Sequence, residues 1–195
     1  MFLNATHRRA KQLSQFVLEY SDNDQSRQLA RNLNIHDDNF DDFYISLTIL
    51  NTFVSALFIQ RFVGNQEMAH KMNNLIADHF DGNRYRVFPF NVVKAPDEIV
   101  FYRQQNLGVL PPGIDPYQSG TDSASILMTI YKRRISVYHQ IAVSNAEDLE
   151  RIWLALAYQF YRDVLGSTAD KSSKEIPLIF GYLMMFGIEI MKLVR

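Results

Sequence analysis

The chain has 195 residues, of which 47% are hydrophobic and 13% aromatic, and this length and apolar content are typical of one domain with its own core. Its formal net charge of −1 gives no electrostatic reason to expect nucleic acid as a partner, and its 21% of charged residues suggests that a partner covers some apolar surface. The absence of cysteine excludes disulfides, thiolate nucleophiles, cysteine zinc sites and iron–sulfur clusters.

Residues 1–82 have the pattern of a helical segment. A polar turn at residues 21–24 separates a first helix from a short one over residues 25–33. A long apolar helix then ends near Gly64, and Asn65 caps the helix that follows.

Two apolar stretches raise the question of a membrane span. Residues 43–60 contain no charge, and residues 176–188 are apolar throughout. The first stretch carries small polar groups at helical spacings, which form one narrow seam: Thr48, Asn51, Thr52 and Ser55. Such a seam suits close packing in a soluble core as well as packing between membrane helices. We expect a buried core helix, with a membrane-associated protein as the alternative.

The pattern changes to strands after Arg84. Runs rich in β-branched and aromatic residues cover residues 84–88, 90–93, 98–103, 126–131 and 135–143. Pro89 predicts an edge or bulged strand, because proline has no backbone donor for a central ladder. Residues 107–120, with three prolines and three glycines, predict a loop.

The last part of the chain predicts two helices. The capping-box pattern Ser144-Asn145-Ala146-Glu147 starts the first, whose apolar face repeats with a period of 3.6. The last helix covers residues 175–194 and is apolar almost all round, so it lies either in the core or against another chain. The prediction is one α+β domain over residues 1–195: helical at 1–82, strand-rich at 84–143 with a mostly antiparallel sheet of about four strands, and helical at 144–195.

Histidine and aspartate residues suggest a metal site, but helix capping explains these aspartates better. His36-Asp37 resembles the dyad of HD-type metal-dependent phosphohydrolases, with His7, His70 and His79 elsewhere in the chain. The acidic residues around His36 are better explained as helix caps and partners of the helix dipole. We therefore expect neither a metal nor another cofactor.

Three further motifs favour ordinary structural roles. Glu67-x-x-His70 has the spacing of di-iron carboxylate bundles, but the motif occurs once and predicts a solvated helix face. Residues 119–123 (SGTDS) resemble part of the phosphate loop of ATP pyrophosphatases, but with too few glycines, and predict a polar turn. The triplet at residues 132–134 (KRR) predicts a solvated hairpin turn rather than a nucleic-acid contact.

The predicted partner-binding residues lie at the edge of the expected sheet. An edge strand beside Pro89 leaves backbone groups unpaired, and neighbouring aromatic side chains supply apolar anchors. The candidate residues are Phe88, Pro89, Phe90 and Tyr102.

Together these patterns predict a non-catalytic, soluble, cytoplasmic protein that binds another protein or peptide, in a hetero-complex or a homo-oligomer. In general character it is similar to bacterial secretion chaperones and adaptors, although no motif assigns it to a family. No nucleic acid and no membrane insertion are expected. The alternative is a metal-dependent or serine/histidine hydrolase whose site is assembled from dispersed His, Asp and Ser residues.

Overall fold

The computed structural model describes residues 5–36, 40–81, 123–165 and 173–194. In chain order the elements are α1 (Ala5–Ser21), α2 (Asp24–Asn32), α3 (Phe40–Phe58), the π-helical turn η2 (Ile59–Val63), α4 (Gln66–Asp81), α6 (Ser123–Ser144), α7 (Leu149–Leu165) and α8 (Glu175–Val194). Every element in these ranges is a helix, so the fold is mainly α. The predicted α+β class with a sheet of about four strands is wrong.

The clearest error concerns α6, where the sequence predicts two strands over residues 126–131 and 135–143. Isoleucine, valine and tyrosine favour strands, but β-propensity depends strongly on context. The buried residues of α6 instead recur at spacings of three and four, as on one face of a helix. Among the α6 residues whose side chains the structure describes, they are Tyr131, Arg134, Tyr138 and Ala142. The other predicted strands, over residues 84–88, 90–93 and 98–103, and the loop at 107–120 lie outside the described residues.

Local capping chemistry sets the ends of several helices, and the sequence predicts two of these ends, at Gly64 and Asn65. The Asn23 side chain accepts a hydrogen bond from the backbone N of Ser26 at 2.9 Å and starts α2. Asn65 does the same for Met68 at 2.9 Å at the start of α4. Between η2 and α4, Gly64 has a φ of 65°, a left-handed conformation that favours glycine.

The start of α7 differs from the predicted capping box at Ser144. The preceding helix, α6, continues through Ser144. The cap is instead Asp148, whose carboxylate accepts a hydrogen bond from the backbone N of Arg151 at 3.0 Å. Serine and aspartate are both preferred N-cap residues. Ser144 is still part of α6, so Asp148 is the residue that caps α7.

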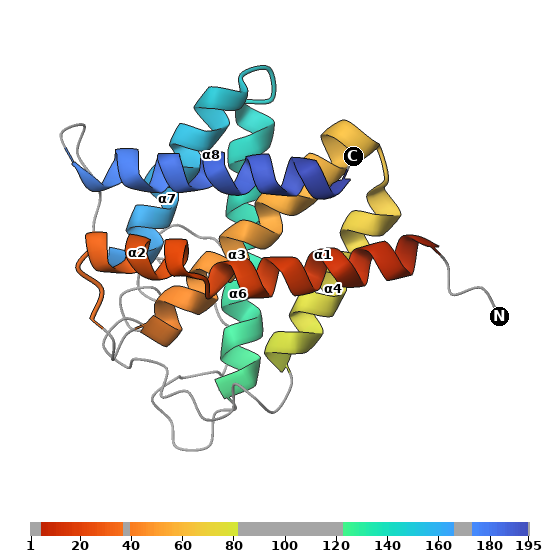
Figure 1. The fold of residues 1–195 in the computed structure, drawn as a ribbon, viewed down its shortest axis with the longest axis horizontal. Coiled ribbons are helices and arrows are strands. Elements are labelled where there is room, and N and C mark those ends of the chain that lie inside the picture. The colour runs from red at the N-terminus through yellow and green to blue at the C-terminus, as the bar shows by residue number, and fades with distance from the viewer. Residues whose placement is uncertain (1–4, 37–39, 82–122, 166–172, 195) are drawn as a thin grey trace.

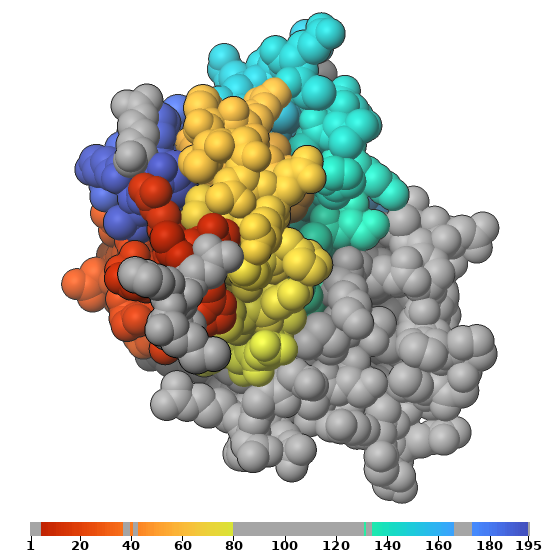
Figure 2. All heavy atoms as spheres, turned by 90° about the vertical axis from the view of Figure 1, so that its right-hand side faces the viewer, coloured from red at the N-terminus to blue at the C-terminus, as the bar shows by residue number. Residues whose placement is uncertain are grey.

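Helix α3 lies at the centre of the bundle and contacts α1, α2, α4, α6, α7 and α8. In Figure 1, α1 and α2 run across the molecule beside α8, which has the opposite direction, and α3, α6 and α7 cross behind them. Figure 2 shows α4 lying between α1 and α6. Helices from both ends of the chain therefore share one hydrophobic core, which extends from Ala10 to Val194.

The predicted polar seam of α3 lies in this core, where all four residues have no exposed surface. Three of its hydroxyls donate to the backbone oxygen four residues earlier: Thr48 to Tyr44, Thr52 to Thr48, and Ser55 to Asn51. This internal bonding satisfies the hydroxyls and leaves a narrow surface for neighbouring helices. Asn51 differs, because its side chain bonds to other helices.

Two segments are long and apolar enough to cross a membrane by length and composition: Phe43–Val63 and Glu175–Val194. In the fold, 83% of the first and 39% of the second is buried inside the protein. Buried core helices pass the same test, and α3 lies in the core of this fold. Most of α8, in contrast, lies at the surface.

Candidate functional site

The partner-binding residues predicted from the sequence, Phe88, Pro89, Phe90 and Tyr102, all lie outside the described residues. The structure therefore neither supports nor opposes a binding edge there. The same holds for Asp37 of the His36-Asp37 dyad.

The histidines are distributed over separate elements. His7 is on α1, His36 follows α2, His70 and His79 are on α4, and His139 is on α6. Within the described ranges, no group of three or more His, Asp or Glu side chains is placed to hold a metal ion. An open groove of about 620 Å³ between α1 and α4 brings His79 near charged residues of α1 but has no deep cavity. In this part of the chain, the histidines do not form one site.

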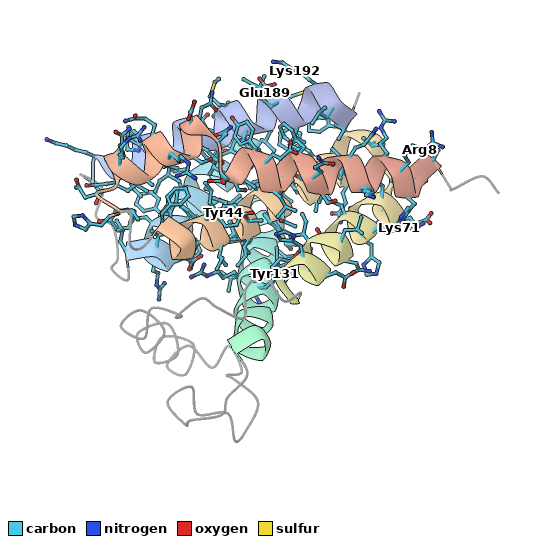
Figure 3. All side chains as sticks on the ribbon, turned by 60° about the horizontal axis from the view of Figure 1, so that its bottom comes forward. Arg8, Tyr44, Lys71, Tyr131, Glu189 and Lys192 are labelled. Carbon is cyan, nitrogen blue, oxygen red and sulfur yellow. The ribbon has the colours of Figure 1, made fainter. Side chains whose placement is uncertain are left out.

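The predicted solvated face of α4 has a simple electrostatic structure. Glu67 accepts a hydrogen bond from Lys71 Nζ at 2.6 Å, an i, i+4 ion pair on the exposed side of the helix. Figure 3 shows Lys71 at the outer side of α4. Tyr131 of α6 is on the inner side of this helix, and its hydroxyl donates to the Asn73 carbonyl at 3.4 Å.

A buried ionic cluster joins α3, α6 and α7. Arg134 is 4% exposed, and its Nη1 donates to Ser46 Oγ at 2.6 Å. Its Nη2 donates to the Asp163 carbonyl at 3.1 Å, and its Nε lies 3.9 Å from Asp163 Oδ2. The Asp163 carboxylate also accepts hydrogen bonds from the Tyr138 hydroxyl at 2.6 Å and from Gln159 Nε2 at 2.8 Å.

This cluster has a structural role. Burial raises the pKa of the Asp163 carboxyl above its ordinary value, while Arg134 and the hydrogen bonds from Tyr138 and Gln159 oppose that rise. A perturbed carboxyl can mark an active site, but this one is enclosed by its own partners, and only 5% of its side chain is exposed. The cluster pairs its two charges within the core and joins α3, α6 and α7.

Sequence reasoning missed this cluster and placed the triplet at 132–134 in a solvated turn. Arg134 is in fact inside α6 and buried. A signal did exist on α7: Asp163 lies three residues after Phe160 and seven after Leu156, so it falls on the apolar stripe. A charged residue on such a stripe predicts a buried partner of opposite charge.

A second buried cluster anchors α8 to the rest of the bundle. The Tyr182 hydroxyl accepts a hydrogen bond from Asn51 Nδ2 at 2.8 Å and lies 3.2 Å from Ser26 Oγ. Asn51 Nδ2 also donates to Ser21 Oγ at 3.0 Å. Aromatic packing strengthens the same contact. The Tyr20 ring packs edge-on against the rings of Tyr182 and Phe186, with centroid distances of 5.9 Å and 5.0 Å respectively. One face of α8 is therefore fixed to α1, α2 and α3.

The opposite face of α8 is exposed and apolar. Between Lys174 and Lys192, every residue of this helix with an exposed side chain or backbone is apolar: Pro177, Leu178, Gly181, Met184, Met185 and Ile188. Leu178, Met184, Met185 and Ile188 are 39%, 41%, 47% and 43% exposed. We call these six residues the α8 outer face. In Figure 3 the side chains of Glu189 and Lys192 extend from α8 away from the bundle and mark one end of this face.

A groove borders the α8 outer face on the side of α2. Its volume is about 610 Å³, and Leu29 of α2 and Leu178, Tyr182 and Met185 of α8 contribute apolar lining. Polar and charged residues of α2 form the opposite wall: Asp24, Gln25, Gln28, Arg31 and Asn32. A surface that combines an apolar helix face with an adjoining groove is typical of sites that accept another helix.

Comparisons with known proteins give no relative: no family model, curated protein or solved structure matches this chain. The chain is thus described by its fold as a mainly α helical bundle and by its site as an exposed apolar helix face.

Proposed function

We propose that this protein is a non-catalytic interaction protein, soluble and cytoplasmic, which binds another polypeptide through the α8 outer face. The observation that carries the proposal is the apolar character of every exposed position of α8 between Lys174 and Lys192. Soluble proteins rarely leave a large contiguous apolar surface in water, and such surfaces usually mark interfaces.

The residue types on this face also support binding. Met184 and Met185 lie side by side near its centre, and methionine side chains adapt to partner surfaces because they are unbranched and polarisable. The face belongs to a helix whose inner side is fixed by Tyr182, so little order is lost when a partner binds.

The hydrolase alternative has less support. In the described part of the chain, neither the cluster around Asp163 nor the cluster around Tyr182 combines a nucleophile, a base and an open cavity. The perturbed carboxyl of Asp163 is enclosed by Arg134, Tyr138 and Gln159. Chemistry at that carboxyl would require access that its neighbours block.

A comparison of three affinity-tagged proteins in native lysate tests the proposal. They are the wild type, Met185→Glu on the α8 outer face, and Val143→Glu as a matched control at the end of α6, where the side chain is 62% exposed. We expect polypeptides, including untagged copies of the chain, to be retained by the wild type and the control and to be lost by Met185→Glu. Each retained polypeptide is then purified, and its affinity is measured by calorimetry. Equal retention by all three proteins, with unchanged circular dichroism, would reject the α8 outer face as the binding surface.

A further inference from the structure

We draw no further inference here: the strongest candidate, the α8 outer face together with the groove that borders it beside α2, belongs to the site already described, and nothing in the structure shows what covers it.

Discussion

The side-chain amide of Asn51 lies 2.8 Å from the Tyr182 hydroxyl, although the two residues are 131 positions apart in the chain. Asn51 is fully buried on α3, and Tyr182 lies on the inner side of α8. This hydrogen bond connects the central helix to the helix that carries the proposed interface. It therefore fixes which side of α8 is turned outward.

Tyr182→Phe tests the strength of this connection. The substitution keeps the ring but removes the acceptor for Asn51 and the contact with Ser26, so we expect the free energy of unfolding to fall by about 1–3 kcal/mol. Urea unfolding followed by circular dichroism measures it. The control is Tyr158→Phe on α7, a partly buried tyrosine outside this cluster, whose replacement should have little effect. A similar loss in both variants would contradict this account.

Arg134→Met tests the buried ionic cluster. The change leaves the Asp163 carboxylate without its cation in the interior, so we expect a loss of about 3–5 kcal/mol in the free energy of unfolding. The double variant Arg134→Met, Asp163→Leu removes both charges and should be more stable than Arg134→Met alone. Equilibrium unfolding of the two variants and the wild type decides this. A double variant less stable than the single one would show that the charges are not coupled.

The raised pKa of Asp163 predicts a pH dependence. The folded protein holds this proton to a higher pH than the unfolded chain, whose carboxyl has the ordinary pKa of 3.8. The resulting contribution to the free energy of unfolding is present below that pKa and is lost as the pH rises through the folded-state pKa. We expect the stability advantage of the wild type over Asp163→Asn to shrink as the pH rises from 3.8. Urea unfolding of both proteins over this range measures the difference, and an advantage that grows with pH would show that Arg134 outweighs burial.

Two glycines of α8 should respond in opposite ways to alanine. At Gly187 a Cβ would lie 3.1 Å from Phe58 Cζ, and the Phe58 ring is held by stacking on Trp153 with centroids 5.6 Å apart. Gly181 has open space. Alanine raises helix stability by about 0.5–1 kcal/mol relative to glycine, so Gly181→Ala should stabilise the chain. Gly187→Ala should not, because the steric cost offsets the gain. Thermal unfolding of the two variants and the wild type compares them, and equal gains would show that Phe58 moves freely.

The cap of α7 gives the last prediction. Asp148→Ala removes the acceptor for the backbone N of Arg151, and we expect a loss of about 1 kcal/mol in the free energy of unfolding. Ser144→Ala should change it by less than about 0.5 kcal/mol, because Ser144 lies within α6. Chemical denaturation of both variants measures the difference. The reverse order would restore the capping box predicted from the sequence.

Much of the helical part of the fold follows from local sequence. The bounds of α8 agree with the predicted helix over residues 175–194, and the cap at Asn65 is confirmed. These features depend on neighbours within one turn of the chain, so they are readable without a fold. The strands predicted over residues 126–143 failed because apolar β-branched residues fit a buried helix as well as a strand, and only the neighbouring helices decide between them.

The sequence alone determined that α8 is an apolar helix, that α3 carries a polar seam, and that cysteine chemistry is excluded. It left open whether α8 lies in the core or against another chain, because a helix that is apolar on all sides has no period that marks an inner face. The tertiary structure decides only which side of α8 is buried within this chain. Tyr182 bonds to Asn51 on one side of α8, and Met185 on the other side is left 47% exposed. The physical reason is that hydrogen bonds between distant segments orient a helix that hydrophobicity alone does not.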